Sequence, residues 1–168
     1  DDKHQRYVQL LDRVKGLEPI PTAVAHPCDE ESLKGPVQAF QAGIIEPILV
    51  GPENKIRAVA EEFGIDLHGI RIVHAAHSHD SAALAVSLVR TGDAEALMKG
   101  SLHTDELMGE VVARANGLRT SRRISHVFIM DVPTYHRPLL ITDAAINIAP
   151  TLEDKADIIR NAIELAHI

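Results

Sequence analysis

Aromatic side chains are scarce in this sequence: its 168 residues include no tryptophan, three phenylalanines and two tyrosines. Because proteins that bind single-stranded nucleic acid stack bases on aromatic rings, this scarcity argues against such a function. The hydrophobic residues, 45% of the chain, must build a mainly aliphatic core. A chain of this length can fold without disulfides, as one domain or as one domain with a fragment of another.

Cysteine, positive charge and long apolar segments are also lacking. The single cysteine, Cys28, cannot form an internal disulfide, which fits a reducing compartment. The net charge of -7 disfavours nucleic acid and anionic membranes as partners. No apolar run approaches the ~20 residues that span a bilayer, and the start, DDKHQRYVQLL, lacks the apolar centre of a signal peptide. We therefore expect a cytoplasmic protein without membrane or nucleic-acid partners.

Short apolar segments alternate with segments of helical periodicity along the whole chain. This pattern predicts strands at 21–27, 47–51, 70–75, 96–98, 126–132 and 138–147, and helices at 5–15, 29–43, 52–64, 78–92, 104–117 and 151–168. Such alternation predicts an α/β fold, with a mostly parallel sheet covered by helices on both faces. The chain becomes purely helical near Pro150, and Thr151 and Asp154 form an approximate capping box for this last helix. We expect residues 1–148 to form a first α/β lobe, and residues 149–168 a helix leading into a second lobe not present in this chain.

The segment AEALMKGSLHTDELMGEVV, residues 94–112, places a polar turn between a predicted strand and a predicted helix. In parallel sheets, ligands bind beyond the carboxyl ends of the strands, where helix N-termini present free N–H groups. Gly100 permits a close approach of the backbone, Ser101 and Thr104 are donors, Lys99 adds a positive charge, and His103 lies in the same turn. We predict an anion site, and the alternative is a turn that only caps the helix. The spacing does not match a phosphate-binding loop of the Gly-x-x-x-x-Gly-Lys-Ser/Thr type.

Two other polar segments give weaker evidence for a ligand site. Four arginines concentrate in ARANGLRTSRRISH, residues 113–126, and guanidinium groups suit phosphates, although a solvated loop would look the same. The histidines of HAAHSHD, residues 74–80, fit no zinc signature, so we interpret them as a loop that caps a helix and expect no metal. We expect Ser78 or Asp80 to be the capping residue.

Asp143 and Asn147 lie on a predicted strand-end segment, LLITDAAINIAP, that has few other polar groups. A carboxylate at such a position could act as a general base or as a hydrogen-bond anchor at the edge of the sheet. Ordinary turn chemistry is the alternative for Asp143.

The segments PILVG, ALMKGSLHTDELM, RRISHVFIMDVP and LLITDAAINIAPTLEDKADII resemble the phosphate acetyl/butyryltransferase family. The resemblance runs from about residue 21 onward, with the motifs in the family's order. LMKGSLHTDELM is most similar to the transacylase part of chains that also carry an enoyl-CoA hydratase domain. The resemblance implies transfer of a short acyl group between coenzyme A and orthophosphate without a cofactor, coenzyme A being a substrate. It also implies a two-lobed isocitrate/isopropylmalate dehydrogenase-like fold and a homodimer.

The resemblance also assigns residues to the site. The Lys99–Thr104 turn, with Gly100, Ser101 and His103, would hold phosphate or acyl-phosphate oxygens, with Ser125, Asp143 and Asn147 as companions at neighbouring strand ends. Arg119 and Arg123 are the candidates for a phosphate of coenzyme A. The arginine that the acetyltransferase branch carries in the next helix is replaced here by Gly109. The catalytic base would lie in a returning C-terminal segment that the chain does not contain, so we expect no turnover by these 168 residues.

Three alternatives remain from the residues alone. The same fold could serve as a non-catalytic module that binds coenzyme A or phosphate. An enoyl-CoA hydratase domain, as in the bifunctional chains, would have a hot-dog fold, which the alternating strand and helix pattern contradicts. A signalling receiver domain needs an aspartate after its third strand, and none follows IRIVHA.

Overall fold

The computed structural model describes residues 5–168 and contains two compact units. The sheet unit is continuous and consists of Lys15–Leu118. The hairpin unit combines the described residues up to Val14 with Arg119–Ile168. This division is not the lobe boundary after residue 148 that the sequence predicts. That boundary, which concerns a longer protein, stays a prediction.

The sheet unit is built on four parallel strands in the order β3-β2-β1-β4. The strands are β1 (Ile20–Ala25), β2 (Ile45–Gly51), β3 (Arg71–His74) and β4 (Ala96–Lys99). Each ends within two residues of its predicted position, because apolar segments buried on both faces of a sheet are short and bounded by turns. The predicted mostly parallel α/β fold is therefore confirmed, and a hot-dog hydratase fold is excluded for this part of the chain.

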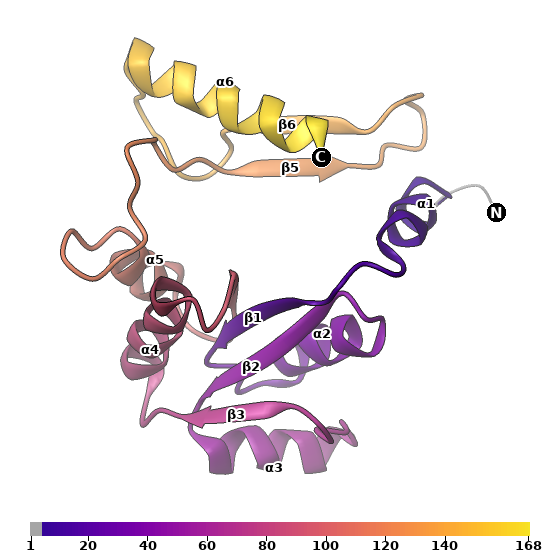
Figure 1. Ribbon diagram of the computed structural model, residues 1–168, viewed down its shortest axis with the longest axis vertical. Helices are drawn as coiled ribbons and strands as arrows, with labels where there is room; N and C mark the ends of the chain where they lie inside the picture. The colour runs from indigo at the N-terminus through magenta and orange to yellow at the C-terminus, as the bar shows by residue number, and fades with distance from the viewer. Residues whose placement is uncertain (1–4) are drawn as a thin grey trace. The chain divides into compact units, whose positions relative to one another are not determined.

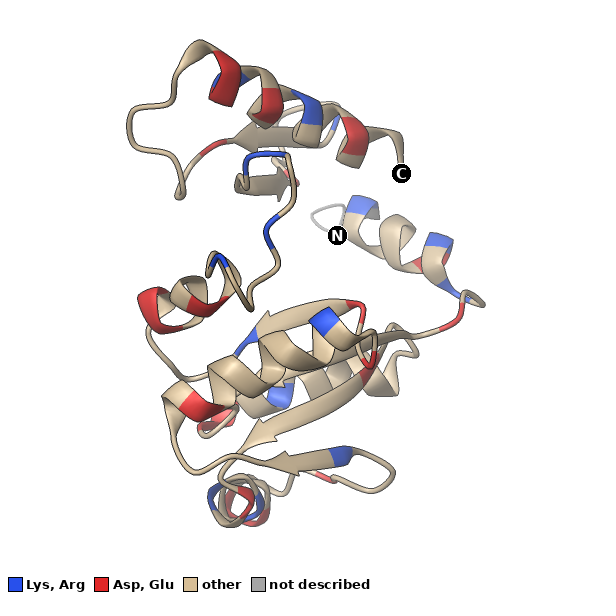
Figure 2. Ribbon diagram, turned by 60° about the vertical axis from the view of Figure 1, so that its left-hand side comes forward, with Lys and Arg blue, Asp and Glu red and all other residues tan. Residues whose placement is uncertain are grey.

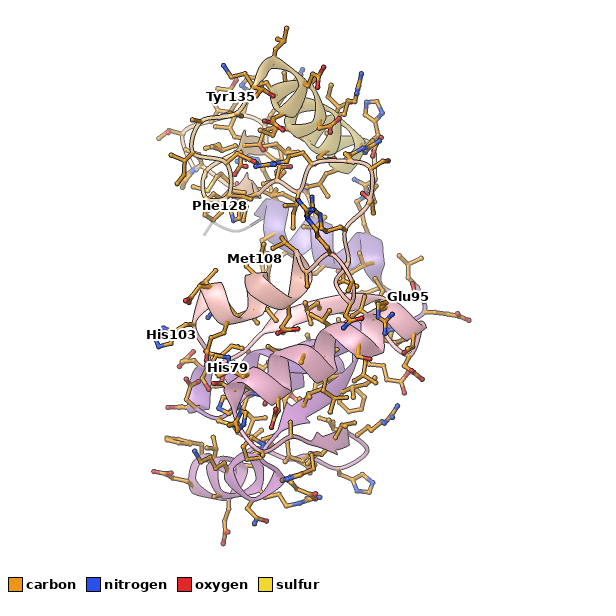
Figure 3. The ribbon with its side chains drawn as sticks, turned by 90° about the vertical axis from the view of Figure 1, so that its left-hand side faces the viewer. His79, Glu95, His103, Met108, Phe128 and Tyr135 are labelled. Atoms are coloured by element: carbon orange, nitrogen blue, oxygen red, sulfur yellow. The ribbon has the colours of Figure 1, made fainter. Side chains whose placement is uncertain are left out.

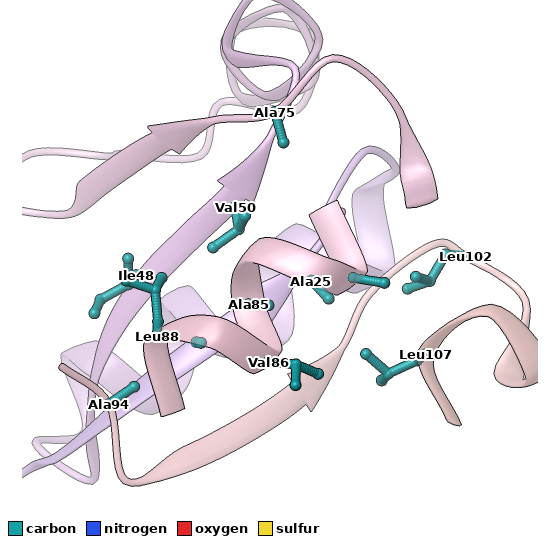
Figure 4. Close-up of a cluster of buried hydrophobic side chains, with 12 residues drawn as sticks. Ala25, Ile48, Val50, Ala75, Ala85, Val86, Leu88, Ala94, Leu102 and Leu107 are labelled. Atoms are coloured by element: carbon teal, nitrogen blue, oxygen red, sulfur yellow. The ribbon is translucent and has the colours of Figure 1, made fainter. Parts of the chain in front are cut away.

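Helices cover both faces of this sheet (Figure 1). They are α2 (Glu30–Gln41), α3 (Glu53–Phe63), α4 (Ser78–Thr91) and α5 (Thr104–Val111). Successive strand side chains point to opposite faces. Val24 accordingly packs in the cluster of α2 and α3, whereas Ala23 and Ala25 pack in the cluster of α4 and α5. Small residues on both sides bring α4 close to the sheet in the second cluster, which contains Ala82 and Ala85 (Figure 4).

Most predicted helix ends are confirmed. Asp29 caps α2 by accepting from the Ser32 amide, and α3 and α4 end at the left-handed residues Gly64 and Gly92. The histidine loop caps α4 as predicted, but the capping side chain is that of His77, so the prediction of Ser78 or Asp80 was wrong.

The predicted start of α5 at Thr104 is confirmed, and its N-cap residue is His103. The predicted end was wrong. The helix ends at Val111, not near Gly117, because the following chain folds back: the Gly117 amide donates to the Ala113 carbonyl and the Leu118 amide to the Val111 carbonyl.

The hairpin unit contains two antiparallel strands, β5 (Val127–Met130) and β6 (Leu139–Thr142), with helices α1 (Gln5–Val14) and α6 (Leu152–His167). Both strands are shorter than predicted. The Thr151–Asp154 capping box predicted for α6 is present, and acidic and basic side chains alternate along that helix (Figure 2).

No helix in the described range, residues 5–168, is both long and apolar enough to cross a bilayer. The two-lobed dehydrogenase-like arrangement is not tested by this fold and stays a prediction.

Candidate functional site

The Lys99–Thr104 turn lies at the carboxyl edge of the parallel sheet. Each of α2, α3, α4 and α5 begins at this edge, because each follows directly from a parallel strand. Figure 3 places His79 and His103, near the starts of α4 and α5, at one end of the sheet unit, and Glu95, just before β4, at the other. Helix N-termini carry unsatisfied N–H groups and partial positive charge, so their gathering favours a negatively charged ligand.

Gly100 fixes how closely the turn approaches β1. Its amide donates to the Ala25 carbonyl at 2.9 Å. A Cβ at this position would lie 2.3 Å from the Ala25 oxygen and 2.6 Å from the His26 oxygen, far inside any normal contact. The sequence therefore requires glycine here for close packing against the protein's own backbone.

Ser101 fastens the turn to the residues that follow β1. Its amide and its hydroxyl both donate to the His26 carbonyl at 2.9 Å, and its oxygen accepts from the Cys28 amide at 3.0 Å. The hydrogens of the Gly100 and Ser101 amides are thus used inside the protein. Ser101 can meet a ligand only through the remaining acceptor capacity of its oxygen, unless these bonds break.

His26 is a residue of this edge that sequence reasoning missed. It exposes 9% of its surface, and its Nδ1 lies 3.0 Å from the hydroxyl oxygen of the fully buried Ser81. Burial, with the positive charge of Lys55, lowers the pKa of His26 below its ordinary value, so the ring is neutral near pH 7. No local signal marks this residue, because the contact with Ser81 joins positions 55 apart in the chain.

Cys28 lies beside the same turn but is not an activated thiol. Burial raises its pKa to about 11, against the smaller opposing effect of Lys55. At neutral pH the group therefore stays protonated and is a poor nucleophile.

Glu106 accepts a hydrogen bond from another donor of the turn, the His103 amide. Its carboxylate accepts from the His103 amide at 2.9 Å and from the Ser78 hydroxyl at 2.8 Å, and it lies 3.1 Å from Nε2 of His79. These interactions, chiefly the His103 amide, lower the pKa of Glu106. Its negative charge at the start of α5 is locally satisfied.

Three kinds of donor remain open at the turn. Among the described residues, the Thr104 hydroxyl and the amides of Thr104 and Asp105 have no hydrogen-bond partner. Within residues 5–168, the Lys99 ammonium group donates only to the adjacent Gly100 carbonyl, at 3.3 Å, and its charge also acts on the Asp29 carboxylate. This set of a cation, a hydroxyl and two helix-terminal amides can bind phosphate oxygens. Within the predicted anion site, the donors that can still bind a ligand therefore belong to Lys99 and the first residues of α5.

The hairpin unit brings four of the other predicted residues into one network. The Asp143 carboxylate accepts from the amides of Ala145, Ile146 and Asn147 and from the Asn147 side chain. Burial alone would raise the pKa of Asp143, but these hydrogen bonds outweigh it and lower the pKa to about 2. The group is thus a firmly ionised anchor and a weak base.

Arg123 and Ser125 complete this network. Nε of Arg123 donates to Oδ1 of Asn147 at 2.7 Å, and the Asn161 side chain donates to the Ser125 hydroxyl oxygen at 2.8 Å. Because β5 and β6 are antiparallel, the start of β5 and the end of β6 meet at one edge. No acceptor in residues 5–168 takes the hydrogen of the Ser125 hydroxyl, so it can be donated to a ligand. Arg119 is exposed and has no partner among the described residues, so it is freer than Arg123 to meet a phosphate.

The turn and the Asp143 network belong to different compact units. Their predicted assembly into one site therefore stays a prediction.

A cavity of about 150 Å³ lies elsewhere, at the amino edge of the sheet. Residues lining it include Pro21, Glu46, Gly69, Arg71 and Asp93. It is separate from the turn, and residues 5–168 contain no group of three side chains arranged to hold a metal ion.

Comparison with known proteins gives a consistent set of relatives. Residues 74–168 match the family model described as phosphate acetyl/butaryl transferase. The chain is 54% identical over 168 residues to a phosphate acetyltransferase of Rickettsia prowazekii, covering all of this chain and 48% of the relative. It is 59% identical over 160 residues to a phosphate acetyltransferase of Rhizobium meliloti, covering 95% of this chain and 51% of the relative. It thus spans about half the length of the curated relatives it matches.

One solved structure matches nearly the whole chain. The crystal structure of a phosphotransacetylase from Streptococcus pyogenes superposes with a TM-score of 0.81 at 19% identity, covering 98% of this chain and 58% of that one. At this identity the likeness concerns the fold.

Proposed function

Because the chain belongs to the phosphate acetyl/butaryl transferase family, we propose that it forms part of a phosphate acyltransferase. The reaction is acyl-CoA plus orthophosphate giving acyl phosphate plus free coenzyme A. The observation that carries the proposal is the family match over residues 74–168, which contains both the Lys99–Thr104 turn and the Asp143 network.

The turn supplies the anion-binding part of this chemistry. Lys99, the Thr104 hydroxyl and the open amides at the start of α5 bind the orthophosphate or the phosphoryl group of the acyl phosphate. Phosphoryl oxygens carry the charge in both substrates, so donors fixed in advance at a helix N-terminus stabilise them without reorganisation.

The hairpin unit supplies polar groups for the reacting ends. The Ser125 hydroxyl can donate to the developing oxyanion of the thioester carbonyl. Asp143 and Asn147 hold the chain at the end of β6 and orient Arg123. Arg119 meets a phosphate of coenzyme A.

Coenzyme A is a substrate in this scheme and no bound cofactor or metal takes part. The active protein is a cytoplasmic homodimer.

The proton of the coenzyme A thiol needs an acceptor that these residues do not provide. Asp143 is held ionised with a pKa of about 2, too weak a base to take a thiol proton efficiently. Nε2 of His26 has no hydrogen-bond partner in the described part of the chain, but the residue is almost completely buried. We therefore keep the catalytic base outside the chain and expect substrate binding without turnover.

Calorimetry and an activity assay together test the proposal. We expect the 168-residue chain to bind acetyl phosphate and coenzyme A, and we expect no acetyl-phosphate-dependent acylation of coenzyme A. We expect Lys99→Met to lose about tenfold in acetyl-phosphate affinity. Lys34→Met, on the exposed side of α2, serves as the charge-matched control and should bind like the wild type.

Two results would contradict this scheme. Robust turnover by the chain alone would refute a base outside these residues. Equal affinities for acetyl phosphate in both variants would refute the role of the turn. Binding without any activity, even when the chain is joined to the remaining half of a relative, would favour the alternative of a non-catalytic module that binds coenzyme A or phosphate.

A further inference from the structure

The backbone of His26 forms the hydrogen bonds that position the Lys99–Thr104 turn, to which the proposed function assigns phosphate binding. Its amide donates to the Val50 carbonyl at 2.7 Å, which continues the pairing of β1 with β2. Its carbonyl oxygen accepts three hydrogen bonds of 2.9 Å, from the Cys28 amide and from the amide and hydroxyl of Ser101. The position of Ser101 therefore depends on the direction of this single carbonyl.

That direction requires an unfavourable backbone conformation. The φ of His26 is 57°, in the left-handed region that residues with a Cβ rarely adopt. A residue keeps such a conformation only where its surroundings hold it, and such residues cluster at functional sites. The residue also precedes Pro27, a position that normally favours an extended backbone.

The side chain of His26 makes a separate contact, with Ser81 of α4. The hydroxyl of Ser81 donates to the His77 carbonyl at 2.7 Å, so its oxygen is left as an acceptor for the imidazole 3.0 Å away. The His26 Nδ1 must then carry a proton, which leaves Nε2 unprotonated. Ser81 is fully buried and lies in the first turn of α4. The ring thus ties the strained residue to a rigid helix.

We propose that His26 is a positioning residue for the Lys99–Thr104 turn. Its ring, anchored to Ser81, holds the left-handed backbone whose carbonyl places Ser101, and thereby places the Thr104 hydroxyl and the open amides of α5 for phosphate. The inference rests on the phosphate-binding role given to the turn in the proposed function, and it deepens that role by naming what keeps the turn in place.

The test compares two substitutions of His26 with a control. His26→Gly removes both the ring and the backbone strain, so the protein should fold. His26→Asn keeps a side-chain N–H at the place of Nδ1, and asparagine tolerates the left-handed region. Val37→Ala removes buried volume in α2, on the opposite face of the sheet, and serves as a control that is destabilised without touching the turn.

Titration with inorganic phosphate and with acetyl phosphate is followed through the amide signals of Gly100, Ser101 and Thr104. We expect His26→Gly to weaken the affinity at least about tenfold, His26→Asn to stay within about threefold of the wild type, and Val37→Ala to bind normally despite its lower stability. Nitrogen NMR of the wild-type imidazole should report a protonated Nδ1 and an unprotonated Nε2.

A ligand-free measurement separates this inference from the proposed function. The Ser101 amide should exchange its hydrogen at least about tenfold faster in His26→Gly than in Val37→Ala, because its acceptor is no longer held. Unchanged exchange, or unchanged phosphate affinity in His26→Gly, would overturn the positioning role. If the wild-type chain binds no phosphate while the exchange result holds, the proposed function of the turn fails but the structural role of His26 stands.

Discussion

Substitution of Gly100 by alanine offers the most direct perturbation of the candidate site. The new Cβ would meet backbone atoms only, at 2.3 Å from the Ala25 oxygen, 2.6 Å from the His26 oxygen and 2.7 Å from the His26 carbonyl carbon. A normal carbon–oxygen contact is roughly 3.3 Å or longer. The turn must therefore retreat from β1 by about 1 Å, since neither backbone can rotate away as a side chain would.

This retreat has a calculable cost. It stretches the Gly100 amide bond to Ala25 and both bonds from Ser101 to the His26 carbonyl, each 2.9 Å in the structure. At about 1 kcal/mol for each hydrogen bond, with about 1–3 kcal/mol for overpacking, the loss is roughly 4–6 kcal/mol. The lower entropy of the unfolded alanine chain returns about 0.5–1 kcal/mol. We expect a net destabilisation of about 3–5 kcal/mol, a large share of the ~5–15 kcal/mol of a typical domain.

Urea unfolding of the wild type, Gly100→Ala and Gly109→Ala measures this effect. Gly109 is an exposed glycine inside α5 whose added Cβ would meet nothing within 4 Å. The control should gain about 0.5–1 kcal/mol, because alanine is the better helix former. With an m-value of about 1–3 kcal/mol/M, the midpoint of Gly100→Ala should fall by at least ~1 M. A midpoint within 0.3 M of the wild type, at unchanged m, would refute the close approach of the turn to β1.

Three further predictions concern single groups. Ser101→Ala removes the hydroxyl that bridges the His26 carbonyl and the Cys28 amide, so the free energy of unfolding should fall by about 1–2 kcal/mol; an unchanged urea midpoint would contradict the bridge. Thr104→Val should weaken phosphate binding about fivefold to tenfold in calorimetry while leaving thermal stability nearly unchanged, and equal affinity would remove its hydroxyl from the site. Asp143 has a folded pKa of about 2, below the ordinary pKa of 3.8 for an aspartate, so its stabilisation is complete above about pH 5 and disappears as the pH falls toward 2. The stability difference between the wild type and Asp143→Asn, at most about 2 kcal/mol after solvent screening, should therefore shrink between pH 5 and pH 3, and a constant difference would argue against an ionised anchor.

The architecture of the sheet unit was predictable because its signals are local. Short apolar segments buried on both faces, such as 47–51, give parallel strands, and Gly64 and Gly92 end helices in the left-handed conformation that the helix terminus needs. The end of α5 was predicted wrongly. The helical pattern continues to Gly117, yet the helix ends at Val111 because the chain folds back on its own carbonyls.

The candidate site was predictable in place but not in detail. Lys99 through Thr104 read as a polar turn after a strand, and Asp143 and Asn147 read as polar residues of one strand-end segment. The hydrogen bond between their side chains was not predicted. Which donors stay free depended on the course of β1, some 75 residues earlier in the chain. The role of His26 could not be predicted either. The local rule for a residue before proline favours an extended backbone, whereas the φ of His26 lies in the left-handed region.

The hairpin unit combines residues from two distant parts of the chain, so the ribosome synthesises its parts at different times. Arg6 in α1 pairs with Asp131 at 2.6 Å, across 125 positions of the chain, whereas the sheet unit is drawn from one uninterrupted stretch. On the ribosome, the sheet unit can complete its own contacts while α1 still waits for its counterpart. At about 5–20 residues per second, that delay lasts roughly 6–25 seconds. During this interval α1 lacks the ion pair between Arg6 and Asp131.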